Sequence, residues 1–260
     1  MAKFILGRKQ SIDNGDWLEA VAQIETLVSR EELDTLVATT LEEIREVTAG
    51  KHTAYAWSGG KDSIVLEKLC DMVGITSSVL GHCSLEYPAF MDWVQQHKPN
   101  GCSLVDTGQD YDFIKKNPIA LFPPMTYHWS RNLQIAAQNR YYKAQGLEVM
   151  MLGRRKADGN FVGKGTNFYT DSKGMSKYNP LADWKHEHVL AFIHYYQCPV
   201  PPIYEWDDGY KIGTHPWFAR PYIKSPAEGW AQIHKIDPSV VVEAAEHLPS
   251  AESFLEGVNA

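Results

Sequence analysis

The sequence predicts an α/β fold in which helices cover both faces of a mostly parallel β-sheet. Short apolar segments alternate along the chain with amphipathic helical segments, which is the pattern of parallel strands joined by helices. Residues 149–152 are short and wholly apolar, as expected for a strand in the middle of such a sheet. The chain has 260 residues, of which 44% are hydrophobic, enough for one domain with additions at its ends.

Residues 1–50 predict a helical segment that packs beside the main domain. Within it, Thr40-Leu41-Glu42-Glu43 matches a capping box, in which the threonine and the second glutamate cap the first turn of a helix. Gly50 stands where such a helix would end. We therefore expect a helix from about Thr40 to Gly50.

The alternation of strands and helices begins after residue 50. Strands are expected at 53–57, 77–80, 103–105 and 149–152. Helices are expected at 63–73, 88–97 and 130–145. Proline at 88 marks a helix start, and glycines at 74 and 146 mark helix ends.

Residues 158–178 predict a long mobile loop, because they are rich in Gly, Lys, Asn and Ser and show no convincing period. Lys164, Lys173 and Lys177 lie in this segment. The segment is therefore either a basic lid that closes over phosphates or an ordinary solvated stretch.

The last third of the chain changes character. A helix is expected at 185–197, with Asp183 as its candidate cap. An irregular segment rich in aromatic residues and proline follows, and then a helical tail around 238–247. We therefore divide the chain into a helical segment at 1–50, a main domain at 51–225 and a helical tail at 226–260.

The composition argues against several classes of protein. A net charge of −7 is unlike that of a general nucleic-acid binder, although a local basic groove, and with it a nucleic-acid partner, stays open. No apolar leader and no long apolar stretch is present, which favours a cytoplasmic protein without membrane contact. The four cysteines (Cys70, Cys83, Cys102 and Cys198) form no Cys-x-x-Cys pair, so we expect reduced thiols, with no iron–sulfur cluster and no zinc site.

Ser58-Gly59-Gly60-Lys61-Asp62-Ser63 lies between an expected strand and an expected helix and predicts a phosphate-binding loop. Glycines let backbone N–H groups turn toward an anion, and the helix adds its positive N-terminal end. Lys61 adds a full charge, while Ser58 and Ser63 can donate hydrogen bonds to phosphate oxygens. Asp62 would either hold the loop or bind a Mg²⁺ ion. The pattern fits neither the Walker loop nor the dinucleotide loop.

The loop resembles the SGGxDS signature of the PP-loop, or N-type ATP pyrophosphatase, superfamily. Further motifs resemble one branch of it, the phosphoadenosine phosphosulfate (PAPS) reductase family. The stretch "GHCSLEYPAFMDWV" keeps Glu86 and Pro88 of that family's pattern "DTGYEFPET", with His82 and Cys83 in place of Asp-Thr. Gly153-Arg154-Arg155 matches its Gly-x-Arg at the end of a later strand.

Two more stretches carry the resemblance toward the C-terminus. "NPLADWKHEHVLAFI" is similar to the family's "NPLADWTxxDVWxYI", and "PPIYEWDDGYKIG" is similar to "HPLYDxGYxSIG". The matches cover about residues 50–225 in the family's order. The resemblance implies an adenine nucleotide α-hydrolase-like, Rossmann-like three-layer sandwich that binds an adenine nucleotide.

The sequence also departs from the reductases of this family. Those enzymes need a cysteine after the last motif, whose thiolate attacks the sulfonucleotide. No cysteine follows Cys198 here, and Thr214 stands where the family commonly has a cysteine after Ile-Gly. Because the intact loop resembles that of relatives that cleave ATP, we expect this chain to bind ATP with Mg²⁺, cleave it between the α and β phosphates and adenylylate an unidentified acceptor.

The resemblance also suggests roles for single residues. Lys61 would stabilise the charge that moves to pyrophosphate, and Arg155, or its neighbour Arg154, would clamp the α phosphate or the acceptor. His82 would either approach the adenine or ribose or simply pack in its loop. Arg220 matches a position where family members place a basic residue near the distal phosphates of the nucleotide.

Two alternatives stay open at this point. One is reduction of PAPS that uses Cys198 or Cys83 in an unconventional way. The other is a non-catalytic nucleotide-binding protein or a partner in nucleic-acid modification. A homo-oligomer or a complex with a partner protein would be compatible with each.

Overall fold

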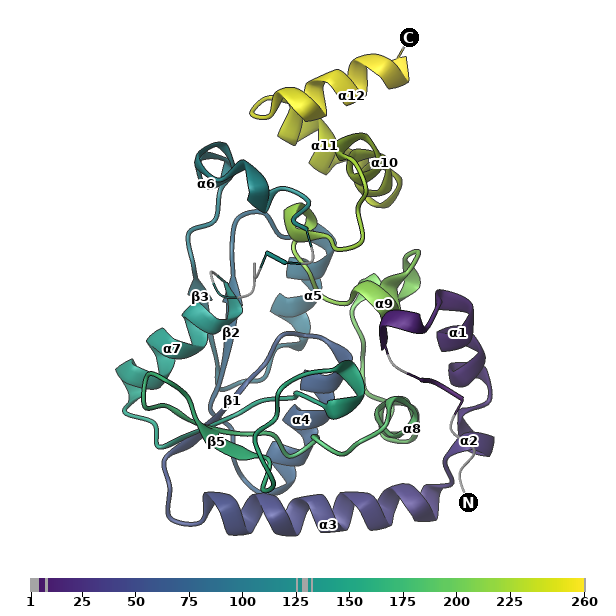
Figure 1. Ribbon diagram of the computed structural model, residues 1–260. Coiled ribbons are helices and arrows are strands. Elements are labelled where there is room, and N and C mark those ends of the chain that lie inside the picture. The colour runs from purple at the N-terminus through teal and green to yellow at the C-terminus, as the bar shows by residue number, and fades with distance from the viewer. Residues whose placement is uncertain (1–4, 8, 125, 128–130, 132, 260) are drawn as a thin grey trace.

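The computed structural model describes residues 5–7, 9–124, 126–127, 131 and 133–259. Within them one sheet contains β1 (Thr53–Ala56), β2 (Ser78–His82), β3 (Cys102–Asp106), β4 (Val149–Met151), β5 (Phe168–Thr170) and β6 (Ser176–Tyr178). The strands lie in the order β3-β2-β1-β4-β6-β5 (Figure 1). Neighbouring strands are parallel, except that β5 and β6 are antiparallel.

Helices cover both faces of this sheet. The main helices of the domain are α4 (Lys61–Met72), α5 (Pro88–His97), α6 (Tyr111–Lys116), α7 (Gln134–Gln145) and α8 (His186–Tyr195). α7 packs against β2 and β3, whereas α4 packs against β1 and is covered in turn by α8 (Figure 1). The predicted three-layer α/β fold with a mostly parallel sheet is therefore confirmed.

The side chains of each strand point alternately to the two faces of the sheet, and each face has its own hydrophobic core. Ala54 and Met150 point to the side where Tyr141 of α7 lies. Tyr55 and Met151, the next residues along their strands, belong to the larger core on the other side. This alternation follows from the two-residue period of a strand, and it explains why central strands that are covered on both faces have wholly apolar sequences.

The strands and helices expected between residues 53 and 152 are present, with ends shifted by a few residues. α5 has the expected bounds, and β2 continues to His82, two residues beyond the expected end. The helix expected at 130–145 begins at Gln134, and residues 130 and 132 of that expectation lie outside the described part of the chain.

The expected long loop at 158–178 is wrong. It begins at the end of η4 (Lys156–Asp158) and contains a hairpin of β5 and β6, and β6 extends the sheet by pairing with β4. Both strands have only three residues, too few to produce a visible alternation in the sequence. Lys177 accordingly lies in β6 with only 4% of its surface exposed, so it cannot belong to a solvated lid.

The N-terminal segment is helical, as expected, and contains η1 (Lys9–Ser11), α1 (Asn14–Ala22), α2 (Ile24–Leu27) and α3 (Arg30–Thr48). The predicted helix start at Thr40 is wrong, because Thr40 lies inside α3. Ser29 caps this helix instead by accepting a hydrogen bond from the Glu32 N–H. The helix continues through Thr40 because the buried Leu33 and Ile44 belong to one apolar stripe.

The C-terminal part contains more helix than expected. Short turns η5 (Pro202–Glu205), α9 (Gly209–Ile212) and η6 (Trp217–Ala219) lead to α10 (Pro226–Ile236), α11 (Pro238–Ala245) and α12 (Pro249–Asn259). The last three helices pack on one another at the top of Figure 1. Each begins with a proline, which fits the first turn of a helix. Among the described residues, no helix is both long and apolar enough to cross a membrane.

Candidate functional site

The predicted phosphate loop joins β1 to α4 in a tight turn. Gly59 has a φ of +65°, and a Cβ at this position would lie only 3.0 Å from the Phe90 ring and 3.1 Å from the Trp93 ring. Only glycine fits both the conformation and the space. Gly60 then caps α4 without a side chain, which leaves the helix end accessible to other groups.

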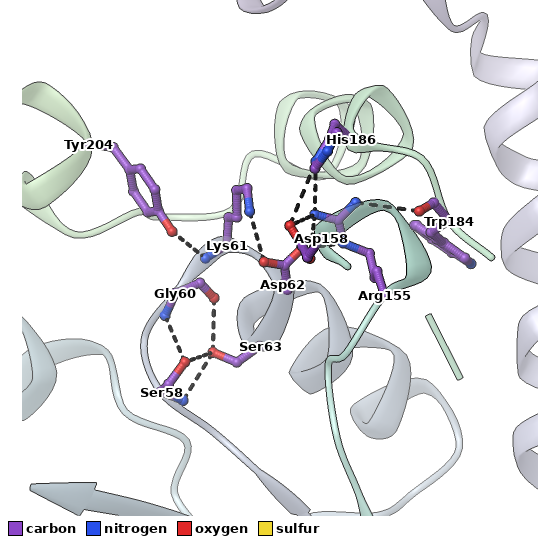
Figure 2. Close-up of polar contacts among 10 residues, drawn as sticks. All are labelled: Ser58, Gly60, Lys61, Asp62, Ser63, Arg155, Asp158, Trp184, His186 and Tyr204. Carbon is purple, nitrogen blue, oxygen red and sulfur yellow. Dashed lines mark hydrogen bonds and ion pairs between the residues drawn. The ribbon is translucent and has the colours of Figure 1, made fainter. Parts of the chain in front are cut away.

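Two serine hydroxyls hold the loop. Ser63 Oγ accepts the Ser58 N–H at 3.0 Å and donates to the Gly60 carbonyl at 2.8 Å (Figure 2). Ser58 Oγ lies 3.2 Å from Ser63 Oγ. The two hydroxyls are thus gathered on one side of the loop, where both face the same cavity.

This cavity has a volume of about 260 Å³ and lies where β1 and β4 end. It is lined by Ala56, Trp57, Ser58, Asp62, Ser63, Val79, Gly81, Gln134, Ile135, Gln138, Leu152, Gly153, Arg154 and Asn160. From β1 the chain first builds β2 and β3 on one side and then returns to place β4 on the other. The cavity therefore occupies the switch point of the sheet, which is where open α/β sheets bind ligands.

The cavity has a polar and an apolar part. Ser58, Ser63 and Arg154 line it near the start of α4, where hydroxyls, a guanidinium and a helix N-terminus suit an anion. Val79 and Ile135 line it on the side of β2 and α7. A ligand with a phosphate group and a flat apolar part would match this division.

The two neighbouring arginines after β4 lie in different environments. Arg154 lines the cavity and donates to the Tyr169 hydroxyl at 3.2 Å. Arg155 is fully buried and donates to Asp62 at 2.6 Å and to Asp158 at 3.2 Å (Figure 2). Consecutive residues of an extended segment point in opposite directions. Arg154, named as the alternative to Arg155, is therefore the arginine that reaches the cavity, whereas Arg155 does not line it. Which of the two contacts a phosphate remains a prediction.

Asp62 is engaged by two cations. Its Oδ1 accepts from Arg155 and its Oδ2 lies 2.8 Å from Lys61 Nζ. Burial alone would raise the pKa of Asp62, but the charges of Arg155 and Lys61 outweigh it and hold the pKa well below its usual range. Because both oxygens have cationic partners, Asp62 does not fit the predicted role of a Mg²⁺ ligand. No group of three or more His, Cys, Asp or Glu side chains within the described ranges is arranged to hold a metal ion.

Lys61 points away from the cavity that the serines face. Its side chain is 4% exposed, and its ammonium lies 5.4 Å from the centre of the Trp17 ring of α1. The N-terminal helices thus cover the charge that we expected beside the phosphates. Its backbone N–H donates to the Tyr204 hydroxyl at 2.7 Å.

His186 completes the buried network, and the sequence interpretation missed it. Its Nδ1 lies 3.1 Å from an Arg155 nitrogen. Burial, together with the charges of Arg155 and Lys61, lowers the pKa of His186 to about 3, so the ring is neutral and accepts this contact. The sequence could have indicated His186 as a site residue, because it directly follows the stretch "NPLADWK", which matches a family motif.

Two other predicted residues are not brought to the cavity. His82 ends β2, is half-buried, and offers its carbonyl to the Thr107 N–H at 3.0 Å. Arg220 is 4% exposed and donates to Gln232 at 2.8 Å, beside a different cavity of about 290 Å³. The proposed contacts of His82 and Arg220 with a nucleotide remain predictions.

Asp183 does not cap α8. The helix begins after Lys185, whose N–H is accepted by His188. The Asp183 carboxylate instead accepts from Lys156 at 2.6 Å and from Asn167 at 3.1 Å. Its role is to tie two loops together rather than to end a helix.

All four cysteines are free thiols, as expected. Cys70, Cys83 and Cys198 are buried, and none of the four belongs to the cavity lining. Burial raises the pKa of each, to about 11 for Cys198. They are therefore protonated at neutral pH and poor nucleophiles.

The fold and the loop together define a class of protein: an α/β domain with a glycine- and serine-rich anion loop at the switch point of its parallel sheet. Residues 52–216 match the family model described as "Phosphoadenosine phosphosulfate reductase domain". This match covers more than half of the chain, which therefore belongs to the PAPS reductase family of the PP-loop superfamily, as the sequence motifs predicted.

Individual relatives support this assignment. The chain is 26% identical over 138 residues to a phosphoadenosine phosphosulfate reductase of Emericella nidulans. That match covers 52% of this chain but only 42% of the relative, so the chain matches less than half the length of that curated protein. A phosphoadenylyl-sulfate reductase from Candida auris, solved as a phosphate complex, has a TM-score of 0.51 and 20% identity over 68% of this chain and 92% of its own. The latter similarity shows the fold alone.

Proposed function

We propose that this protein binds ATP in the cavity at the ends of β1 and β4, cleaves it between the α and β phosphates and transfers AMP to an acceptor. One observation carries the proposal. The cavity brings Ser58, Ser63 and Arg154 together over the first turn of α4, while its other side is apolar. A triphosphate and a purine would each meet suitable groups there.

In this proposal the apolar part of the cavity holds the adenine. Gln134 and Gln138 of α7 also line it, and their amides can donate to and accept from the base. The phosphates lie at the loop, with Arg154 beside the α phosphate. Mg²⁺ enters as part of the substrate, MgATP, because Asp62 is already paired.

The reaction needs little covalent chemistry from the protein. An acceptor oxygen attacks the α phosphorus, the bond from that phosphorus to the bridging oxygen breaks, and pyrophosphate leaves with the electron pair. The protein has to align the two oxygens and neutralise the growing negative charge. The serine hydroxyls, the amides of the loop and Arg154 would serve that end.

The names of the relatives support a second candidate, the reduction of a sulfonucleotide. That chemistry needs a thiolate next to the bound nucleotide. The four thiols of this sequence are protonated and lie outside the cavity lining, so their placement favours adenylylation. Thioredoxin-dependent release of sulfite from PAPS, abolished by one Cys→Ser substitution, would reverse this preference.

The test is to incubate the protein with ATP, Mg²⁺ and a panel of oxyanion, carboxylate and nucleic-acid acceptors, and to follow AMP and pyrophosphate by phosphorus NMR. We expect both products with at least one acceptor. ATP binding without either product under every condition would instead indicate a non-catalytic nucleotide-binding protein.

A matched pair of variants locates the reaction. Arg154→Ala removes a cation that lines the cavity and should raise the KM for ATP about tenfold or more, because a charge-assisted contact to phosphate is lost. Lys156→Ala removes a cation two residues away that pairs with Asp183, and it should leave KM unchanged. Equal effects of the two substitutions would place the nucleotide elsewhere.

A further inference from the structure

The first backbone N–H of α4 has a partner from a distant part of the chain. The Tyr204 hydroxyl oxygen accepts the Lys61 N–H at 2.7 Å, across 143 residues of sequence (Figure 2). Gly60, which precedes Lys61, has no side chain that could serve as a cap. The phenol therefore caps the helix end at which a phosphate would bind.

The hydroxyl of Tyr204 is a neutral ligand for this N–H. Tyr204 is 7% exposed, and burial raises the pKa of its phenol, so the group keeps its proton. A hydrogen bond from an amide to a charged phosphate oxygen is stronger than one to a neutral oxygen. A phosphate that reached Lys61 could therefore take over its N–H.

Other hydroxyls surround the same point of the loop. A Cβ at Gly60 would lie 3.2 Å from Thr214 Oγ1, 3.3 Å from Ser58 Oγ and 3.6 Å from the Tyr204 hydroxyl. Three hydroxyl oxygens from three segments thus meet above Gly60. Ser58 also lines the cavity, so it links this group of hydroxyls to it.

Space for a movement of Tyr204 lies next to it. A second cavity, of about 190 Å³, is bordered by both Lys61 and Tyr204. Its remaining lining is mostly apolar: Val21, Ile24, Leu190, Ile193, His194, Val200 and Tyr210. A phenol ring displaced from the loop could enter this space, where most of the lining side chains are apolar.

We propose that Tyr204 is a positioning residue that competes with phosphate for the Lys61 N–H. Its hydroxyl holds the amide while no pyrophosphate group is bound, and it gives the amide up to a phosphate oxygen of ATP or of the pyrophosphate product. This inference rests on the proposed function, because it assigns a role within the same site. The competition weakens the binding of pyrophosphate and so favours its release.

The test measures the affinity of inorganic pyrophosphate for the whole protein by calorimetry. Tyr204→Phe keeps the ring and removes the competing oxygen, so pyrophosphate should bind about three- to tenfold more tightly, the value of one hydrogen bond. Tyr195→Phe is the matched control, because the Tyr195 hydroxyl donates to the Val28 carbonyl and does not touch the loop. The affinity of Tyr195→Phe for pyrophosphate should equal that of the wild type.

A variant with a damaged structure would bind pyrophosphate more weakly, which is opposite to the expected change. Weaker binding by Tyr204→Phe would overturn the inference, because the hydroxyl would then be a ligand of the anion. Unchanged binding would also overturn it, because the anion would then not use this amide. A second measurement needs no variant: pyrophosphate added to the wild-type protein should shift the amide NMR signal of Lys61, and an unmoved signal would contradict the proposal.

These outcomes are separate from those of the proposed function. If ATP yields no pyrophosphate with any acceptor, the proposed reaction fails, whereas the comparison of pyrophosphate affinities stays valid. If ATP is cleaved and Tyr204→Phe binds pyrophosphate as the wild type does, only the role of Tyr204 is lost.

Discussion

Arg155 shows how one buried side chain can hold the loop from behind. Its guanidinium contacts the Asp62 carboxylate on the first turn of α4, Asp158 in η4 and the ring of His186 on α8. Three elements that are distant in sequence therefore meet at one charge. Because Asp62 also holds Lys61, the position of the loop depends on an arginine that does not line the cavity.

Replacing Arg155 by alanine should cost stability as well as activity. The substitution leaves Asp62 and Asp158 without their main partner in a buried place, and breaking such a pair lowers the free energy of unfolding by about 3 kcal/mol or more. Urea denaturation followed by circular dichroism measures this. Lys156→Ala, at the exposed neighbouring position, should stay within about 0.5 kcal/mol of the wild type. A loss below about 1 kcal/mol for Arg155→Ala would contradict the structure of this network.

Glu86 gives the protein a pH-dependent stability. Burial raises the pKa of Glu86 to about 8, and the nearest side-chain partner of its carboxyl is the thiol of Cys83, at 3.9 Å. Between its unfolded pKa of about 4.3 and a folded pKa of about 8, the folded state binds more protons than the unfolded state. The contribution of Glu86 to stability is therefore complete below the lower value and declines as the pH rises to the upper one.

Glu86→Gln removes this dependence while it keeps the shape of the side chain. The stability of the variant minus that of the wild type should be larger at about pH 8.5 than at about pH 5. Thermal unfolding of both proteins at the two pH values measures this. An equal difference in stability between variant and wild type at both pH values would mean that Glu86 is ionised in the folded protein.

At the scale of elements, the β5–β6 hairpin is the feature that most changes the sequence-based interpretation. Lys177 of β6 is buried, its ammonium has no hydrogen-bond partner, and it lies 5.5 Å from the centre of the Tyr142 ring. Burial lowers the pKa of this lysine. An amine held in this way contributes little to stability beyond the packing of its carbon chain.

Lys177→Met should therefore raise the free energy of unfolding by about 1 kcal/mol, since the apolar side chain fills the same space without an unsatisfied charge. Lys173→Met, at an exposed position of the same hairpin, should leave stability nearly unchanged. Equal changes in the free energy of unfolding for the two variants would mean that Lys177 is as solvated as a residue of an open loop.

Elements with long periodic patterns or clear end signals were predictable from the sequence. α5 has its proline start, β4 its apolar run, and the loop before α4 its glycines. The three-residue strands of the hairpin were not predictable, because they are too short to show a period and because they depend on pairing, β6 with β4 and β5 with β6.

The residues of the site were predictable only in part. Ser58 and Ser63 were found because the loop is contiguous in sequence. The contact between Tyr204 and Lys61 was not found, because it joins segments 143 residues apart. The choice between Arg154 and Arg155 was also open, because it depends on the direction in which the chain leaves β4, and no residue type encodes that direction.

At the scale of the whole molecule, one hydrophobic core includes residues from every part of the chain. Trp17 of α1, Trp184 before α8 and Trp230 of α10 are all buried in it. In Figure 1 the N-terminal helices lie beside α8 and below the sheet, and the C-terminal helices lie above it. Both end segments are thus packed onto the sheet domain, and the N-terminal one covers Lys61.

Glu187 has a consequence for how the chain is made. Its carboxylate accepts the N–H groups of Ile5 and Leu6 at 2.8 and 2.6 Å, across 182 and 181 residues. A ribosome adds about 5–20 residues per second, so roughly ten to forty seconds separate the synthesis of Ile5 from that of Glu187. The contact that fastens the N-terminal segment can therefore form only after residue 187 has been made. Until then, the N-terminal segment that covers Lys61 lacks this attachment to α8.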